Sequence, residues 1–403
     1  MKKLEKSVPV IRFKGFSEAW EQRKLGEVFT ERSEKSSKGE LISVTISSGV
    51  IKASELERKD ISSSDKSNYK VVKKGDIAYN SMRMWQGASG HSLFDGILSP
   101  AYTIITPKKN ISSKFISYIF KKHNMIQNFQ RRSQGLTSDT WNLKFPALSG
   151  IKVKIPNYTE QAKISDFFQH IDNTIALHQR KLDALKKMKK GFLQQMFPKS
   201  EEDVPKIRFT DFNGNWRQRK LEEVADRVRG NDRRMELPTL TISASKGWLN
   251  QHDRFFGNIA GKEQKNYTLL KKGQLSYNHG NSKSAKYGAV FVLRTYDEAL
   301  VPRIYHSFKT NILANSDFIE YLFATKIPDR ELRKIVSSGA RMDGLLNINF
   351  NDFMSILIML PFVEEQIKIS NSLIRLDKII SLYQNKLDQL IKLKKAYLQY
   401  LFI

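Results

Sequence analysis

The sequence predicts an α+β protein made of two mixed α/β domains separated by an antiparallel two-helix coiled coil, with internal pseudo-two-fold symmetry. Two observations lead to this prediction. One half-length pattern occurs twice in the 403 residues. Each copy ends in a long stretch whose apolar residues have coiled-coil spacing.

The repeat is clearest near the start of each half. Val8 to Val28 and Val204 to Val224 are identical at 13 of 21 positions. Three further pairs match: Tyr69 to Asn80 with Tyr267 to Asn278, Ser133 to Asp139 with Ser337 to Asp343, and Glu160 to Ser165 with Glu365 to Ser370. The matches extend through both halves, so we expect two domains of the same plan.

The charge balance restricts the class of partner. Lys and Arg number 68 against 41 Asp and Glu, which gives a net charge of +27 and a pI near 9.9. This excess favours a polyanion such as nucleic acid. No apolar run approaches the roughly 20 residues of a membrane-spanning helix, and the start has no apolar signal core. The absence of cysteine is compatible with a cytoplasmic protein.

Both halves contain short apolar runs bounded by turn residues, followed by helical spacing. The expected strands lie at Lys70 to Asn80, Ala101 to Thr106, Gly288 to Leu293 and Ile304 to His306. The expected helices lie at Ser112 to Arg132 and Asn315 to Ser337.

Two later stretches repeat a coiled-coil seam of alternating four- and three-residue steps. The first seam is Ile164, Phe168, Ile171, Ile175, His178, Leu182, Leu185, Lys189, Phe192 and Met196. The second is Ile369, Leu373, Leu376, Ile380, Tyr383, Leu387, Leu390, Lys394, Tyr397 and Leu401. A helix packed only on its own domain would explain an apolar stripe but not so long a seam.

If the two seams pair with each other, the helices are expected to run antiparallel, because the pseudo-two-fold axis that relates the two halves must lie across them. A helix of about 37 residues is about 55 Å long. Such a rod would hold two DNA-reading domains one helical turn of DNA or more apart. We therefore expect a target in two parts with an unread spacer.

Base-reading residues are expected in two matched loops of each half, where Arg, Lys, Asn and Gln gather. The candidates in the first half are Asn80, Arg83, Trp85, Gln86, Arg131, Arg132, Gln134 and Ser138. Those in the second half are Asn278, His279, Asn281, Lys283, Lys286, Arg341 and Met342. The alternative for each is a solvated loop side chain.

Phosphate contacts need only positive charge, and several cations near the expected strands are candidates. They are Lys73, Lys74, Lys271, Lys272, Arg227, Arg229, Arg233 and Arg234. Solvated turns before Gly75 and Gly273 explain the paired lysines equally simply. The matched Trp20 and Trp216 are expected to be core or docking anchors.

An enzyme is the main alternative. An adenine methyltransferase needs a Pro-Pro-aromatic loop and a Gly-rich turn, which neither Ser99 to Tyr102 nor Gly257 to Gly261 matches. The phosphate-loop likeness at Gly257 to Lys262 lacks one residue and the Ser or Thr. Asp329, Glu331 and Lys334 resemble a charged helix face more than a nuclease cluster. The histidines have no metal-ligand spacing. A non-specific RNA-binding or structural coiled-coil protein is a third hypothesis.

Several paired motifs resemble those of type I restriction-modification specificity subunits. They are the W-x-x-R-K-L-x-E-V segments at Trp20 and Trp216, the E-Q-x-K-I-S starts at Glu160 and Glu365, and the K-L-D-x-L endings at Lys181 and Lys386, each followed by K-K-x-(Phe/Tyr)-L-Q. The resemblance covers nearly the whole chain. It implies target recognition domains at 1–158 and 199–363, with conserved helical spacers at 159–198 and 364–403.

The resemblance also implies a function and partners. In that family each recognition domain reads half of an asymmetric bipartite DNA site, and the helical regions bind methyltransferase subunits and set the spacer. It implies two modification subunits, plus two restriction subunits for cleavage, in a bacterial cytoplasm. This chain would be non-catalytic and without cofactors, whereas the other subunits would use S-adenosylmethionine, ATP and magnesium.

Overall fold

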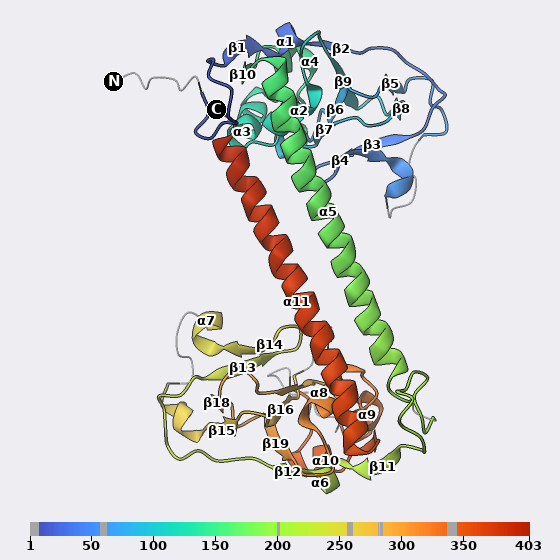
Figure 1. The fold of residues 1–403 in the computed structure, drawn as a ribbon, viewed down its shortest axis with the longest axis vertical. Helices are drawn as coiled ribbons and strands as arrows, with labels where there is room; N and C mark the ends of the chain where they lie inside the picture. The colour runs from blue at the N-terminus through green and yellow to red at the C-terminus, as the bar shows by residue number, and fades with distance from the viewer. Residues whose placement is uncertain are drawn as a thin grey trace. The chain divides into compact units, whose positions relative to one another are not determined.

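The chain folds into two compact units that share two long helices. A computed structural model describes residues 8–56, 63–199, 202–255, 261–280, 282, 285–336 and 345–403. Unit 1 consists of residues 1–179 and 385–403, and unit 2 of residues 180–384. The helices α5 (Tyr158–Gln195) and α11 (Val363–Tyr400) each contribute one stretch to each unit (Figure 1).

Unit 1 combines short antiparallel strands with four short α-helices and its share of the long ones. Its strands are β1 (Glu21–Lys24), β2 (Phe29–Glu31), β3 (Ile42–Thr45), β4 (Gly49–Lys52), β5 (Lys70–Val72), β6 (Ile77–Asn80), β7 (Ser89–His91), β8 (Gly96–Leu98), β9 (Tyr102–Pro107) and β10 (Lys152–Ile155). Its helices and 3-10 turns are α1 (Leu25–Val28), η1 (Ala53–Glu55), η2 (Met84–Gln86), α2 (Ser113–Ile119), α3 (His123–Arg132) and α4 (Phe145–Ser149). A four-stranded sheet of order β2-β9-β6-β7 is accompanied by the pairs β1-β10, β3-β4 and β5-β8.

Unit 2 repeats this topology. Its strands are β11 (Arg217–Lys220), β12 (Ala225–Arg227), β13 (Leu240–Ser243), β14 (Gly247–Asn250), β15 (Thr268–Lys271), β16 (Leu275–Asn278), β17 (Ala289–Val292), β18 (Glu298–Val301), β19 (His306–Thr310) and β20 (Leu357–Leu360). Its helices and 3-10 turn are α6 (Leu221–Val224), α7 (Gln251–Phe255), η3 (Gly261–Asn266), α8 (Ser316–Ala324), α9 (Asp329–Ile335) and α10 (Phe350–Met354). The sheet order β12-β19-β16-β17, with pairs β11-β20, β13-β14 and β15-β18, matches unit 1 strand for strand. The expected duplication is therefore confirmed in the fold.

Four expected elements differ from the structure. The strand predicted over Lys70 to Asn80 is two strands, β5 and β6, separated by a turn at Lys74 and Gly75. The single helix predicted over Ser112 to Arg132 is two helices, α2 and α3, because the backbone of Lys122 is extended, with φ −70° and ψ 142°. The helix predicted over Asn315 to Ser337 breaks into α8 and α9, since Lys326 has a positive φ of 68° and Pro328 follows. Most of the strand predicted at Ile304 to His306 is a turn, and β19 begins only at His306.

Each unit has a core between its sheets and the long helices. In unit 1, α2 packs against β6 and β7 and also contacts α5, where the rings of Tyr118 and Phe168 lie 5.0 Å apart (Figure 1). Trp20 and Trp216 are 5% and 3% exposed and belong to the two main cores. The expectation that these tryptophans are core anchors is confirmed, which leaves them unable to stack on bases.

The long helices run antiparallel within each unit. In unit 1, Phe167 and Asp172 of α5 contact Tyr397 and Lys394 of α11, so the numbering rises along one helix as it falls along the other. In unit 2, Lys189 meets Asp377. Every expected seam residue is buried or half-buried, whereas apolar residues off the seam such as Leu177 and Leu382 are 59% and 65% exposed. The expected antiparallel coiled-coil seam is therefore confirmed.

The lysine in each seam forms an ion pair across the two helices. Lys189 Nζ lies 2.6 Å from Asp377 Oδ1, and Tyr321 of α8 donates its hydroxyl to Asp377 Oδ2 at 2.8 Å. The same arrangement joins Lys394, Asp172 and Tyr118 of α2 in unit 1, at 2.5 and 2.9 Å. Burial, together with the carboxylate, raises the pKa of both tyrosines, so they remain donors at neutral pH. A polar pair in an apolar seam fixes the register of the two helices.

Reversing one of these charges is expected to weaken unit 2. Lys189→Glu would place two carboxylates together and cost on the order of 2 kcal/mol in the free energy of unfolding of unit 2. The exchange Lys189→Glu with Asp377→Lys is expected to recover most of that loss, as measured by hydrogen exchange of unit 2 in urea. Combining Lys189→Glu with Asp172→Lys, from the other ion pair, serves as the control. Equal recovery in both double variants would contradict this register.

The first turn of each long helix is tied to its own domain. Arg12 and Arg208 make paired hydrogen bonds to the buried Glu160 and Glu365. The side chain of Gln161 donates to Pro156 O at 2.9 Å and accepts from Ser112 N at 2.9 Å, and its repeat equivalent Gln366 does the same. The acidic and amide residues of the two E-Q-x-K-I-S motifs therefore dock the helices onto the domains.

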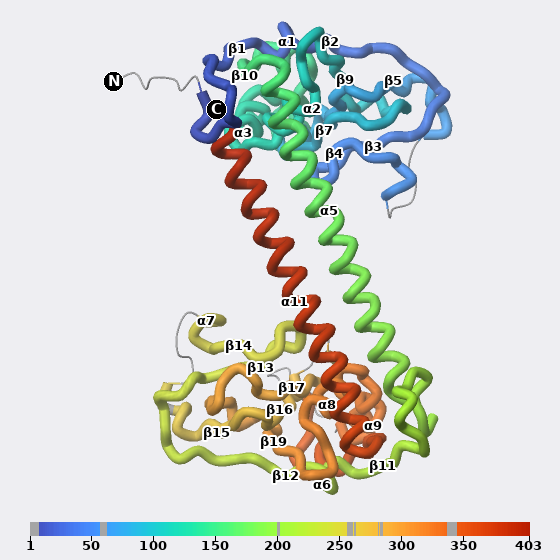
Figure 2. Tube along the Cα trace, in the orientation of Figure 1, coloured from blue at the N-terminus to red at the C-terminus, as the bar shows by residue number. Residues whose placement is uncertain are grey.

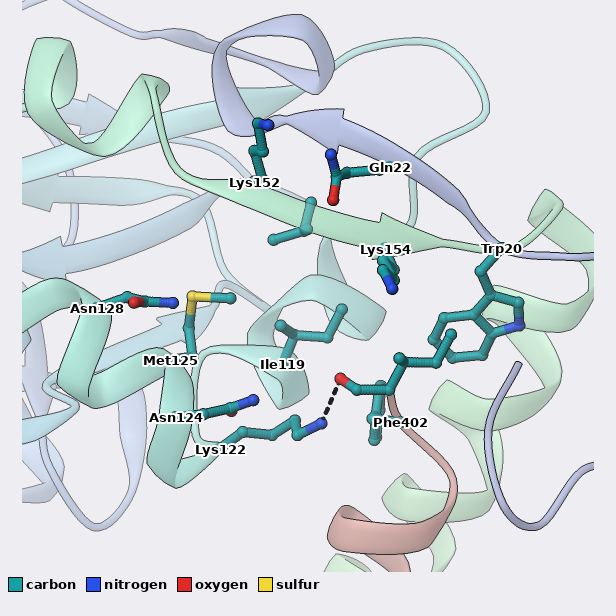
Figure 3. Close-up of a pocket in the computed structure, with 12 residues that line it drawn as sticks. Trp20, Gln22, Ile119, Lys122, Asn124, Met125, Asn128, Lys152, Lys154 and Phe402 are labelled. Carbon is teal, nitrogen blue, oxygen red and sulfur yellow. Dashed lines mark hydrogen bonds between the residues drawn. The ribbon is translucent and has the colours of Figure 1, made fainter. Parts of the chain in front are cut away.

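Segments from both ends of the described chain lie together in unit 1. The segment before β1 runs beside the end of α11, where Ile11 N donates to Tyr400 O at 3.0 Å (Figure 2). Phe402 packs edge-on against Trp20 at 6.3 Å, and Lys122 Nζ donates to Ile403 O at 2.7 Å beside a pocket of about 300 Å³ (Figure 3). Burial lowers the pKa of Lys122 to about 8. Residues 401–403 therefore complete the core of unit 1.

Candidate nucleic-acid interface

The two loops predicted to read bases in the first half meet in the structure. Leu143 N donates to Ser81 O at 2.9 Å, which joins the loop after β6 to the loop after α3. The rings of Trp85 and Trp141 pack edge to face at 5.3 Å across the same junction. Trp85 also donates its indole N–H to Met82 O at 3.1 Å. The two loops therefore form one surface, called here the unit 1 loop pair (residues 80–87 and 133–142).

The candidates in the first of these loops have different exposures. Arg83 is exposed, and Trp85 and Gln86 are half-buried. Asn80 Oδ1 accepts a hydrogen bond from Met82 N at 3.0 Å, so this oxygen shapes the turn. Arg83 is therefore the residue of this loop that is best placed to reach a base.

The second loop follows α3 and carries its candidates on the surface. Arg131 and Arg132 are exposed in the last turn of α3, where their positive charge also favours the C-terminal end of the helix dipole. Gln134 and Ser138 are exposed as well. These four side chains are free to approach a ligand.

Lys121 supports the unit 1 loop pair and was not among the sequence candidates. Its Nζ donates to Gly87 O at 2.6 Å and to Ile46 O at 3.3 Å, so it links the first loop to the hairpin of β3 and β4. Burial lowers the pKa of Lys121 to about 8. A lysine in a run of charges gives no sequence signal for such a role, because the run is typical of solvated helix ends.

In unit 2 the loop after β16 contacts Leu345 and Leu346, which follow the second predicted loop, Ser337 to Asp343, and that loop lies outside the described residues. Leu346 N donates to His279 O at 2.9 Å, and Gly280 forms an antiparallel bridge with Leu345. Asn278 Oδ1 accepts from Gly280 N at 3.0 Å, as Asn80 does in its own turn. Lys286 is exposed, with its Nζ 5.8 Å from the centre of the Tyr287 ring. The candidates Asn281, Lys283, Arg341 and Met342 lie outside the described residues.

His279 is a correction to the predicted site. Its side chain is 2% exposed, and its ring lies 4.9 Å from that of His306 inside the domain. It therefore cannot reach a base from this position. Burial lowers the pKa of His306, whose Nε2 lies 2.9 Å from Ile348 O. In unit 1, the buried hydroxyl groups of Ser81 and Thr103 lie 2.7 Å apart in the corresponding region after β6.

Several cations proposed for phosphate contact are paired with acidic side chains. Lys73 lies 3.5 Å from Asp95, and Lys272 lies 3.1 Å from Asp297. Other pairs and contacts are those of Lys271 with Glu298, Arg234 with Asp232 and Glu298, and Arg227 over the Phe350 ring at 4.1 Å. These contacts fit the turn interpretation of the paired lysines.

The features considered for an enzyme do not converge. Lys334 donates to Glu331 on the exposed side of α9, as expected for a charged helix face. Most of the phosphate-loop likeness at Gly257 to Lys262 lies outside the described residues. Within the described ranges, no three or more His, Asp or Glu side chains are grouped to hold a metal ion. No helix in these ranges is long and apolar enough to cross a membrane.

Comparisons with known proteins agree on one family. Residues 17–187 match the family described as type I restriction modification DNA specificity domain. The chain is similar to the type I restriction enzyme MjaVIII specificity subunit of Methanocaldococcus jannaschii, at 23% identity over 351 residues, which cover 82% of this chain and 79% of that protein. Its fold is similar to the crystal structure of a type I restriction-modification system S subunit from M. genitalium, with TM-score 0.61 and 12% identity over 98% of this chain and 99% of the other.

Proposed function

Because this chain belongs to the family of type I restriction-modification specificity subunits, we propose that each of its units binds one part of a two-part DNA target. The observation that carries this proposal is the convergence of the two predicted loops in unit 1, together with the repeated topology of unit 2, where the loop after β16 contacts Leu345 and Leu346. The unit 1 loop pair presents Arg and Gln side chains, which bind guanine and adenine edges in the major groove. The net charge of +27 supplies attraction to the phosphates.

The proposal extends to the partners of this chain. Each unit presents the same arrangement of α5 and α11, with a lysine in the seam paired to an aspartate and a tyrosine. Equivalent surfaces suit two copies of one partner, and we propose two modification subunits in this role. Two restriction subunits would join for cleavage in the bacterial cytoplasm. S-adenosylmethionine, ATP and magnesium would bind to those other subunits, and this chain would have no catalytic role.

Exchanging the first recognition domain is expected to change only one half of the target. We expect a chain with residues 1–158 from another family member to keep the second half of its methylation motif and to acquire a new first half. The reason is that the unit 1 loop pair is built entirely from residues of unit 1. The measurement is methylation mapping of DNA from cells that express the complex with its modification subunits.

Two controls complete this experiment. The reciprocal exchange of residues 199–363 is expected to change only the second half. The isolated chain, supplied with S-adenosylmethionine, is expected to methylate nothing, whereas methylation or cleavage by it would favour the single-chain enzyme. A domain exchange that altered both halves of the motif would contradict the division of labour between the units.

A further inference from the structure

One leucine on the unit 1 loop pair has no packing role. Leu136 is 101% exposed, the highest value for a large apolar side chain in the described ranges. Full burial of a leucine is worth about 1.5–3 kcal/mol, so this side chain contributes none of that to the fold. Residues 134–141 of this loop otherwise carry mostly polar side chains. Leu136 is therefore available to an apolar group on a partner.

The loop that carries Leu136 is held in place from both sides. Gln134 and Asn142 exchange backbone hydrogen bonds at 3.0 and 2.8 Å, so a single antiparallel bridge closes the loop at its base. Thr140 N donates to Thr137 O at 3.0 Å across the tip. Gly135 has a φ of +148°, and a Cβ there would lie 2.7 Å from the backbone of Thr140. The exposure of Leu136 is thus a property of a closed turn that needs glycine beside it.

The surroundings of this turn favour DNA as the partner. Arg131 and Arg132 are exposed at the end of α3, directly before the loop, and Gln134 is exposed at its base. A cationic, hydrogen-bonding surface suits the phosphates and base edges of a duplex better than an apolar protein face. The major groove, about 12 Å wide, admits an α-helix or a two-stranded ribbon, so it is wide enough for a loop closed by one bridge. The main apolar group that bases present there is the 5-methyl group of thymine.

We propose that Leu136 contacts the 5-methyl group of a thymine in the half of the target bound by unit 1. The proposal rests on the proposed function and adds a residue that determines specificity. Neighbouring Arg and Gln side chains would read bases by hydrogen bonds, whereas Leu136 would favour thymine over cytosine by apolar contact. One buried methyl group corresponds to roughly a fourfold change in affinity.

This contact can be tested by removing the thymine methyl group and the Leu136 side chain, separately and together. The complete complex with modification subunits is titrated with its mapped duplex target and with duplexes in which deoxyuridine replaces each first-half thymine in turn. At one position, removal of the methyl group is expected to weaken binding by the wild-type complex roughly fourfold. For Leu136→Ala, which is expected to bind the unmodified target several-fold more weakly, that same replacement is expected to have no effect.

Several outcomes would overturn the proposal. These are equal weakening by deoxyuridine in both complexes, no weakening at any position in the wild type, or wild-type affinity in Leu136→Ala. Impaired assembly of Leu136→Ala with the modification subunits, with normal DNA affinity of the assembled complex, would instead assign the leucine to a protein contact and overturn it too.

Two controls separate this test from the proposed function. Leu93→Ala removes another exposed leucine of unit 1, 52% exposed in the turn after β7, and is expected to bind both duplex types as the wild type does. Specific binding by the wild-type complex, measured against a scrambled duplex, supports the proposed function whether or not Leu136 touches a thymine. Equal binding of the wild-type complex to the target and to the scrambled duplex would contradict the proposed function itself.

Discussion

Replacing Arg12 with methionine is expected to lower the free energy of unfolding of unit 1 by about 3–5 kcal/mol. The side chain of Glu160 is 0% exposed, and the Arg12 guanidinium donates to it from Nε at 2.8 Å and from Nη2 at 2.7 Å. Methionine keeps the length of the side chain but removes both donors, which leaves a buried carboxylate without its cation. Hydrogen exchange of the full chain in urea, followed at the amides of β1 and β10, measures this loss.

The repeat supplies a matched control for this experiment. Arg208→Met is expected to weaken unit 2 by a similar amount, because Glu365 is 1% exposed and bonded in the same way. The double change Arg12→Met with Glu160→Leu is expected to recover most of the stability, since no buried charge remains. Equal losses in both units from Arg12→Met alone, or no recovery in the double variant, would contradict this account of the pair.

Replacing Trp216 with alanine is expected to destabilise unit 2 by about 3–5 kcal/mol. Trp216 is 3% exposed and lies between Phe318 and Phe197, with ring centres 5.6 and 6.2 Å away. Alanine would leave a cavity where strand β11, helix α8 and the residues after α5 meet. Amide exchange in β11 and β20 of the full chain in urea reports this loss.

A second substitution separates packing from hydrogen bonding at this tryptophan. The indole N–H of Trp216 is buried and has no hydrogen-bond partner among the described residues, which is unfavourable by about 1–3 kcal/mol. Trp216→Phe removes this group and keeps most of the ring volume, so it is expected to cost far less than alanine. Trp20→Ala is the matched change in unit 1. A Phe variant as unstable as the Ala variant would contradict this account, because removal of an unpaired buried N–H cannot itself destabilise the fold.

The sequence was sufficient for the architecture because its strongest patterns are long or repeated. A seam kept over ten positions in each half predicts a helix, its buried face and its pairing, and Lys189 and Lys394 indicate where polar contacts interrupt it. The shorter helices were harder to predict. Apolar residues continue at helical spacing across Lys122 and Pro328, where the backbone geometry divides the helices. The spacing alone therefore predicted one helix where the structure has two.

The candidate site could be located by loop but not by residue. Matched loops after β6 and α3 were predicted separately, and tertiary contacts such as Leu143 with Ser81 bring them together. His279 follows a strand with buried side chains on both faces, so the alternation that usually distinguishes inside from outside is absent. Leu136 is not among the predicted base-reading residues, because an apolar side chain is normally expected to be buried in a core.

The core of unit 1 can be completed only late in the synthesis of the chain. Leu401 and Phe402, 2% and 3% exposed, belong to the same core as Trp20 and Phe115. A ribosome that has made residues 8–179 must add 205 more, residues 180–384, before the second stretch of unit 1, residues 385–403, begins to appear. At about 5–20 residues per second, that takes about 10–40 s. During this interval the nascent first domain carries uncovered aromatic surface, so the half translated first becomes complete only after the half translated second.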